Sequence, residues 1–266
     1  MSKIHRRQGA ELDGMREAGH IAASILKRAA EEVRPGVSTK HIDDVAAELT
    51  REAGCKSAFL NYVQRNGGTP FSGHICISLN EEIVHGIGNP RRIIQNGDIV
   101  KIDVGIVTPA GWVGDNAKTV PVGMIQPDVQ QLLRATEDSL DAAISHARAG
   151  EQLKVLCGAV EKCVRQYGYC VVREFVGHGV GRRLHEEPQV PNWADPRIKV
   201  KLAPGMILAV EPMVNMGTDQ VTVLDDQWTV ITKDRRPSAH FEHTILITDG
   251  VPEILTPRER LTKPLS

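Results

Sequence analysis

Two histidines in a glycine-rich stretch are the first residues of this sequence whose types and spacing could do chemistry. His178 and His185 lie seven residues apart, and Gly177, Gly179 and Gly181 surround the first of them. Glycine is favoured where the backbone takes unusual torsions or where a ligand comes close. We therefore expect a loop that leaves the His178 imidazole uncrowded. A glycine-rich turn that merely contains a histidine is the alternative, and acidic residues elsewhere must decide between the two.

Four acidic residues fall in segments whose composition predicts β-strands, namely Asp103, Asp115, Glu211 and Glu242. Acidic residues are depleted in strands, and a buried carboxylate without a partner costs several kcal/mol. Any one of them could pair with a lysine or arginine or face water. Two divalent cations would balance all four, and oxygen ligands with one imidazole suit Mn, Fe(II), Co or Zn. Such a pair of ions activates a bound water and polarises a carbonyl group, so the residues predict a hydrolytic metal centre.

The composition of the 266-residue chain sets limits on its class. A hydrophobic fraction of 41%, a charged fraction of 24% and a net charge of −1 are typical of a globular protein and favour neither nucleic acid nor a membrane surface as partner. No apolar run approaches the roughly 20 residues that span a bilayer, and the start lacks a signal-like apolar segment. Five cysteines without CxxC spacing indicate free thiols, and hence a cytoplasmic location. We expect the basic residues Lys3, Arg6 and Arg7 to be solvated.

Apolar spacing and turn residues predict the elements that must position these side chains. Helices are expected over Glu11–Glu32, from the Ser38-Thr39 cap to Gly54, over Asp128–Ala147 and onward to about Tyr167. Strands are expected over Ile75–Leu79, Glu82–Val84, Gly97–Ile106, Trp112–Val122, Val171–Phe175 (entering the His178 loop), Met206–Glu211, Val221–Leu224, Thr229–Thr232 and His240–Ile247. Residues 61–73 are expected to form a loop.

The order of the expected elements repeats along the chain. Gly97–Asp103 corresponds to Gly205–Glu211, and residues 33–40 correspond to residues 147–154, in the same order within each half. This predicts two α+β half-domains that share one core. The expected organisation is an N-terminal extension (1–10), one catalytic domain (11–255, with halves of about 11–125 and 126–255) and an irregular tail (256–266).

The motifs that contain these residues closely resemble those of type I methionine aminopeptidase. They are Cys76–Asn80 with His85-Gly86-Ile87, Lys101–Val104, Gly114-Asp115, Gly177–Gly181, His185–Val190, Glu211–Asn215 and Phe241–Thr244. The resemblance runs from about Leu12 to Leu255, and the short interval between His178 and Glu211 leaves no room for the insertion of the type II enzymes. It implies the α+β pita-bread fold, with two pseudo-symmetric α/β halves, a central antiparallel sheet and helices outside.

The resemblance also implies how a dinuclear centre would be held. Asp103 would chelate one metal ion, Asp115 and Glu242 would bridge both, and His178 and Glu211 would complete the second. The ions would be two of Mn, Fe(II), Co or Zn, and the sequence does not choose among them. Glu211 would also act catalytically, moving the proton of the metal-bound water.

Around that centre the resemblance implies a substrate site. His85 would contact the substrate amine or its amide nitrogen, and His185 the scissile carbonyl, both as catalytic residues. The apolar pocket for the methionine side chain would be formed by Phe71, Cys76, Leu184 and Trp228. The sequence departs from the family pattern here: residues 64–69 are extra, Pro70–His74 replaces the usual loop, Asn116 stands for threonine or a small residue, and His240 stands where glutamine is common.

The implied activity is removal of the initiator methionine from nascent polypeptides whose second residue is small, by attack of a metal-bridging hydroxide. Partners would be nascent N-termini, met at the ribosome, and the enzyme would be a monomer that binds neither nucleic acid nor membrane. Two other functions stay open. One is an aminopeptidase of the same fold with an X-Pro or broad preference at the first residue. The other is a non-catalytic peptide-binding relative.

Overall fold

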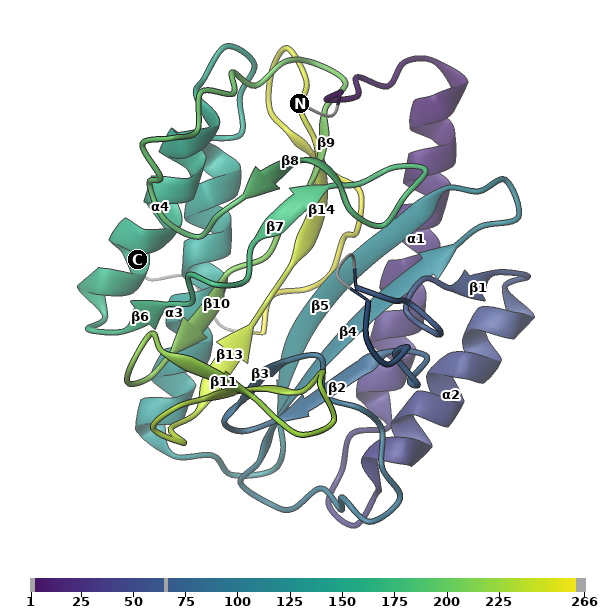
Figure 1. The fold of residues 1–266 in the computed structure, drawn as a ribbon, viewed down its shortest axis with the longest axis vertical. Coiled ribbons are helices and arrows are strands. Elements are labelled where there is room, and N and C mark those ends of the chain that lie inside the picture. The colour runs from purple at the N-terminus through teal and green to yellow at the C-terminus, as the bar shows by residue number, and fades with distance from the viewer. Residues whose placement is uncertain (1–2, 65–66, 262–266) are drawn as a thin grey trace.

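A computed structural model describes residues 3–64 and 67–261 of the chain. Residues 65–66 of the altered loop, Met1 and Ser2 of the extension, and residues 262–266 of the tail lie outside the described part. Two pairs of helices flank the strands on opposite sides, the purple and blue pair on one and the teal pair on the other (Figure 1). One pair belongs to each predicted half of the chain, and the division into two half-domains stays a prediction.

The helix pair of the first half forms for reasons visible in its sequence. In α1 (Ala10–Glu31) small and branched apolar side chains recur at helical spacing on the buried face, among them Ala18, Ala22 and Ile25. In α2 (Thr39–Glu52) the hydroxyl of Ser38 accepts a hydrogen bond from the backbone N–H of His41 and so caps the helix start. Both helices agree with the expected boundaries to within about two residues.

A long hairpin is the central element of the first half. Strands β4 (Ile99–Val107) and β5 (Val113–Pro121) pair antiparallel over their whole length, from Ile99 opposite Pro121 to Val107 opposite Val113. The other edge of β4 pairs with β1 (Lys56–Ser57) and β2 (Cys76–Leu79). Helix α1 packs on this hairpin, where Gly114 lies so close to α1 that a Cβ would stand 2.1 Å from the carbonyl oxygen of Ala18.

The second half pairs α3 (Pro127–Ser145) and α4 (Leu153–Gln166) with a five-stranded sheet. Its strand order is β15-β14-β9-β7-β8, and its ladders are antiparallel. The strands are β7 (Gly177–Gly179), β8 (Glu186–Val190), β9 (Ile207–Val210), β14 (His243–Leu246) and β15 (Glu253–Ile254).

Two further three-stranded sheets are also antiparallel, and one of them joins the halves. The sheet with the order β13-β10-β6 lies within the second half, and the other, with the order β11-β12-β3, pairs β3 of the first half with β12 of the second. The strands are β3 (Glu82–Val84), β6 (Cys170–Val171), β10 (Met213–Asn215), β11 (Val221–Val223), β12 (Val230–Thr232) and β13 (Ser238–His240).

Several predicted strands need correction. The strand expected over Val171–Phe175 is wrong beyond Val171, because β6 ends there and the next strand begins only at Gly177. The segment His240–Ile247 is two strands, β13 and β14, which belong to different sheets. His178 lies within strand β7 and not in a loop. Residues 61–73 form the expected loop in their described part.

Each half has its own buried apolar cluster. The first is centred on α1, α2, β2 and β4, with Met15, Ile42 and Ile102 among its members. The second is centred on α3, α4, β9 and β14, and includes Leu132 and Phe241. Within the described ranges, none of the helices combines the length and the apolar character that crossing a bilayer requires.

Candidate metal centre

The β4–β5 hairpin brings the first two carboxylates together. Asp103 lies opposite Ala117, and Asp115 lies opposite Gly105 two positions along the ladder. Residues in this diagonal relation project from the same face of an antiparallel pair. The glycine at 105 removes the side chain that would otherwise stand directly opposite Asp115; its own close neighbour is the ring of Phe59.

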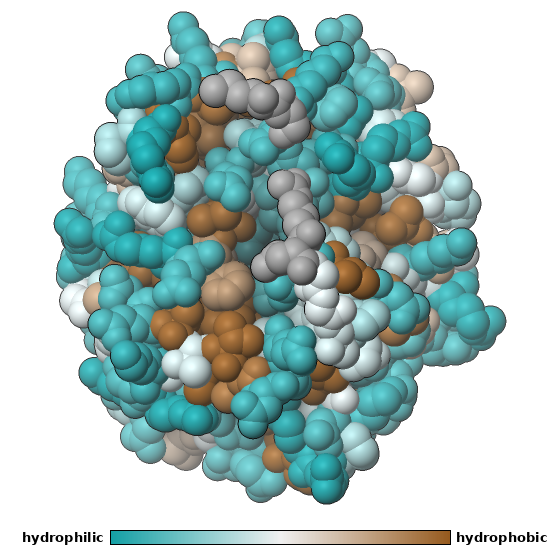
Figure 2. Space-filling model, viewed as in Figure 1, coloured by the Kyte–Doolittle hydropathy of each residue, from teal (hydrophilic) through white to brown (hydrophobic). Residues whose placement is uncertain are grey.

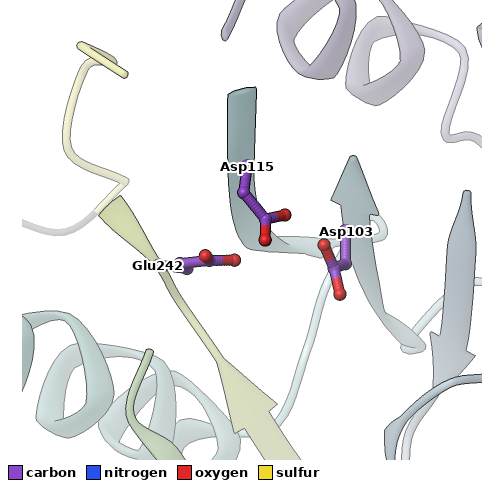
Figure 3. A group of neighbouring side chains, drawn as sticks. All are labelled: Asp103, Asp115 and Glu242. Atoms are coloured by element: carbon purple, nitrogen blue, oxygen red, sulfur yellow. The ribbon is translucent and has the colours of Figure 1, made fainter. Parts of the chain in front are cut away.

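The second half delivers Glu242 to the same place through hydrogen bonds across the pseudo-symmetric junction. The backbone N–H of Glu242 donates to the carbonyl of Ala117 at 2.9 Å, and the hydroxyl of Thr244 donates to the carbonyl of Asp115 at 2.7 Å. One carboxylate oxygen each of Asp103, Asp115 and Glu242 lies within 4.8 Å of the others. The side chains of Asp103 on β4, Asp115 on β5 and Glu242 in the link between β13 and β14 point toward one another (Figure 3).

The carboxylates of this group lack the partners that buried acids normally have. Among the described residues, Asp103 Oδ1, Asp115 Oδ1 and Glu242 Oε1 are buried and take part in no hydrogen bond. Burial raises the pKa of Asp115 to about 7, and burial together with repulsion from neighbouring carboxylates holds the pKa values of Asp103 and Glu242 well above their usual range. Hard oxygen donors that are both orphaned and mutually repelled fit divalent cations.

His178 presents one ring nitrogen to this group. Its Nδ1 lies 3.0 Å from the carbonyl oxygen of Gly179, which only accepts, so Nδ1 carries the proton. Nε2 therefore offers a lone pair, 3.6 Å from Asp115 Oδ2 and 3.4 Å from Glu211 Oε1. Glu211 follows the last residue of β9 directly, and burial with repulsion from Asp115 and Asp103 raises its pKa well above the usual range.

The glycines around His178 have a different purpose from the one expected. None of the three has a positive φ, so unusual torsions do not explain them. A Cβ at Gly177 would stand 2.3 Å from the carbonyl oxygen of Ala209, and one at Gly179 would stand 2.3 Å from that of Glu187. The neighbouring strands β9 and β8 approach this backbone too closely for any side chain. The glycines thus allow β7 to carry His178 in the middle of the sheet.

A cavity of about 410 Å³ opens over the carboxylates. On the face shown in Figure 2, a hollow lies near the centre beside hydrophobic side chains. All the sequence-predicted site residues line this one cavity: Phe71, Cys76, His85, Asp103, Asp115, His178, Leu184, His185, Glu211, Trp228 and Glu242. The roles of these residues in binding and catalysis stay predictions, but all of these residues line the same cavity.

His85 stands at the wall of the cavity in a rare backbone conformation. Its φ is +61°, in the left-handed region that non-glycine residues seldom adopt. Gly86 follows it, where a Cβ would meet the carbonyl oxygen of Ile77 at 2.2 Å. The His85 ring packs edge-on against Phe175 and Trp228, and burial, with a contribution from His185, lowers its pKa to about 4. The imidazole is therefore neutral at physiological pH.

The N-terminal segment supports the cavity through Arg7. Lys3 and Arg6 are exposed as expected, but the expectation of a solvated side chain is wrong for Arg7. The guanidinium of Arg7 is buried and donates to both carboxylate oxygens of Glu186, at 2.9 and 2.8 Å. Glu186 also accepts the backbone N–H groups of Arg182 and Arg183. It follows His185 directly, so this ion pair anchors the turn that carries the imidazole. Because Arg7 and Glu186 are 179 residues apart, no local sequence pattern predicts this contact.

Three residues near the centre were not assigned a role from sequence. His240 is buried, and its Nε2 lies 3.8 Å from Glu211 Oε2 without a hydrogen bond to any described residue. Lys101 is buried on β4, and its ammonium donates to the carbonyls of Asn80 and Ser238, one from each half. Tyr62 contacts His185. Of these three residues, only His240 departs from the family pattern in the sequence, where glutamine is common.

Comparison with known proteins decides the family. Residues 13–249 match the sequence profile of Metallopeptidase family M24. Methionine aminopeptidase 1 of Bacillus subtilis is 45% identical over 246 residues, which are 92% of this chain and 96% of that protein. The chain belongs to family M24. Its similarity to the methionine aminopeptidase of Escherichia coli, 41% identity over 96% of this chain and 94% of the other, places this M24 peptidase in the methionine aminopeptidase branch.

Solved structures agree with this placement. The crystal structure of a methionine aminopeptidase from Thermotoga maritima superimposes with a TM-score of 0.91 and 38% identity, covering 96% of this chain and all (100%) of that one. A prolidase from Pyrococcus horikoshii matches with a TM-score of 0.76 at 22% identity, over 96% of this chain and 64% of the prolidase, which shows a common fold alone. The predicted pita-bread fold and the resemblance to type I methionine aminopeptidase are confirmed, and this M24 peptidase is a metal-dependent hydrolase.

Proposed function

We propose that this peptidase removes the initiator methionine from polypeptides with a small second residue, using two divalent ions at the centre described above. The chain is a methionine aminopeptidase by its relatives. The observation that supports the dinuclear centre is the group of buried, orphaned carboxylates that both halves direct to the floor of one cavity. Such a group is costly without cations, and a structural role would not require it.

The residues that would hold the ions are those that the resemblance to type I methionine aminopeptidase implies. Asp103 would chelate one ion, and Asp115 and Glu242 would bridge both. His178 and Glu211, whose Nε2 and Oε1 atoms lie 3.4 Å apart, would complete the second. When bound, the ions supply a water of lowered pKa and a Lewis acid for the carbonyl group. Manganese, iron(II), cobalt and zinc all suit this donor set.

The remaining chemistry belongs to side chains of the chain itself. Glu211, whose carboxylate borders the cavity, would take the proton from the attacking water and pass it to the leaving amine. His85 would contact the substrate nitrogen, and its neutral imidazole can accept or donate a hydrogen bond there. His185 would donate a hydrogen bond to the scissile carbonyl oxygen as negative charge develops on it.

The apolar side of the cavity would receive the methionine side chain. Phe71 and Trp228 pack edge-on with ring centroids 5.2 Å apart, and Cys76 and Leu184 complete this wall. Sulfur contacts aromatic ring edges favourably, so the pocket suits a thioether. We further propose that the enzyme works in the cytoplasm as a monomer and meets its nascent substrates at the ribosome.

One experiment tests this function. Metal-stripped protein is reloaded with Mn, Fe(II), Co or Zn and assayed for release of the first residue from Met-Ala-Ser and Leu-Ala-Ser, with Glu211→Ala and His85→Ala beside the wild type. We expect metal-dependent release of methionine that both substitutions abolish. Equal release of leucine would keep the metal chemistry and reject the methionine specificity. Bound metal without hydrolysis of either peptide would favour a non-catalytic peptide-binding role.

A further inference from the structure

The loop that precedes β2 places a tyrosine hydroxyl on one of the site histidines. The Oη atom of Tyr62 lies 2.7 Å from Nδ1 of His185, and the two rings meet edge to face with centroids 5.3 Å apart. The partners are 123 residues apart in sequence. We propose that Tyr62 is a positioning residue that acts through His185, and this inference rests on the role proposed for that histidine.

Tyr62 is held firmly enough to orient a neighbour. Its backbone N–H donates to the carbonyl of Phe59 at 2.8 Å, and its carbonyl accepts the N–H of Phe71 at 2.9 Å. Asn61 beside it adopts a left-handed φ of +63° and donates to the carbonyl of Phe71. The Tyr62 ring also packs edge-on against Trp228. Both ends of the side chain are therefore fixed, so the hydroxyl stays at a defined point of the cavity rim.

The hydrogen bond favours one form of the imidazole. A phenol can donate or accept, but its O–H is more acidic than the N–H of a neutral imidazole and is therefore the better donor of the two. In a neutral imidazole one ring nitrogen carries the proton and the other accepts. When the phenol O–H donates to Nδ1, the proton of His185 lies on Nε2, at the far side of the ring. Nε2–H is the donor that a scissile carbonyl oxygen or a developing oxyanion requires. Tyr62 thus holds His185 in the tautomer that donates into the cavity.

The contact also fixes where the ring of His185 lies. On its other side, this ring meets that of His178 with centroids 4.4 Å apart and an interplanar angle of 78°. His185 is exposed, so without such contacts its side chain would sample several rotamers. Tyr62 from one half and His178 from the other confine it between them. A small change of this geometry affects the transition state more than the bound substrate.

A double-mutant cycle tests the inference in the metal-loaded enzyme with Met-Ala-Ser as substrate. Tyr62→Phe removes only the hydroxyl, and we expect kcat to fall about tenfold, the value of one ordinary hydrogen bond, with KM changed less than about twofold. His185→Ala should lower kcat about 100-fold or more. In the His185→Ala background, Tyr62→Phe should have no further effect, because its action passes through the imidazole. Additive losses, or no loss in the single variant, would overturn the inference.

A second measurement does not depend on turnover. The 15N resonances of the His185 ring in zinc-loaded protein, assigned with the His185→Ala variant, report which nitrogen is protonated. We expect Nε2 to be protonated in the wild type and the two tautomers to mix in Tyr62→Phe; identical spectra would refute the inference. Tyr167→Phe is the matched control, since it removes a phenol hydrogen bond to Asp138 outside the cavity and should change neither readout. If the wild type does not cleave the peptide, the proposed function fails, and the spectra alone then decide the role of Tyr62.

Discussion

The floor of the cavity (Asp103, Asp115, Glu211 and Glu242) and its rim (Tyr62, Leu184 and His185) are stabilised in opposite ways. The floor consists of carboxylates fixed by strands, buried, close to one another and short of hydrogen-bond partners. The rim consists of side chains on loops, of which Leu184 is buried, whereas Tyr62 and His185 are accessible to solvent and hydrogen-bond to each other. The charges of the floor are balanced only when cations bind, whereas the hydrogen bonds of the rim form without them. Substitutions should therefore act differently in the two regions, in size and in sign.

The largest effect should come from neutralising a floor carboxylate. Glu242→Gln keeps the shape of the side chain and removes a charged member of the proposed ligand set. Since changes in groups behind the ligands already cost 10–100-fold, we expect kcat/KM to fall more than about 100-fold, with loss of at least one bound ion. Activity assays and metal analysis of the dialysed protein measure both. Glu174→Gln, on an exposed glutamate, is the control and should change neither. An unaltered metal content would remove Glu242 from the ligand set.

Next in size is the support behind the rim. Arg7→Met leaves the buried carboxylate of Glu186 without its guanidinium, and breaking such a pair should lower the free energy of unfolding by about 3 kcal/mol. Urea denaturation measures this loss. The matched control is Arg6→Met, because Arg6 is exposed and donates a single hydrogen bond to the carbonyl of Pro204. Equal losses in both variants would show that the Arg7–Glu186 pair does not stabilise the turn.

A change of opposite sign should appear in the floor when metal is absent. The metal-free wild type holds repelling acids together, so Glu242→Gln should be more stable than the wild type under these conditions. One unit of pKa shift corresponds to about 1.4 kcal/mol, which sets the scale of the gain. Thermal unfolding in a chelator measures it. With metal added, the order should reverse, and a variant that is less stable in both conditions would contradict the view that the floor is strained by charge.

Substitution of Leu184 in the rim should change the selectivity for the first residue of the substrate and have little other effect. Leu184→Ala enlarges the apolar pocket, and a misfit of this size changes discrimination by about 1–3 kcal/mol. We expect the ratio of kcat/KM for Met-Ala-Ser over Leu-Ala-Ser to fall about tenfold. Leu60→Ala, outside the cavity lining, is the control and should leave the ratio unchanged. A parallel fall for both peptides in Leu184→Ala would mean that this leucine supports the fold and not the specificity.

The smallest effect on activity is expected for Val63, which lies just outside the rim. Val63 follows Tyr62 but is 46% exposed and does not line the cavity. Val63→Ser should therefore change kcat/KM less than about twofold and the free energy of unfolding by less than about 0.5 kcal/mol. Steady-state kinetics on tripeptides and on longer peptides measure this. A tenfold loss confined to the longer peptides would extend the substrate site across this residue.

The sequence allowed much of the floor to be predicted, because its signals are local. Helical spacing located the four helices, and carboxylates within strand-like runs identified Asp103 and Asp115. The rim was harder. The contact between Tyr62 and His185 and the burial of Arg7 join residues far apart in the chain, and no local pattern encodes them. His178 was placed in a loop because three glycines normally indicate one, yet here they allow two neighbouring strands to approach.

The hydrogen bonds that join Glu242 and Thr244 to the β4–β5 hairpin also bear on how the protein is made. Synthesis proceeds from the N-terminus, so Asp103 and Asp115 exist for a time without the acids and the imidazole of the second half. A chain interrupted between the halves has two repelling acids and no complete ligand set. With the proposed ligand set, metal binding is therefore a late event in the synthesis of each molecule, and it distinguishes finished chains from chains interrupted between the halves.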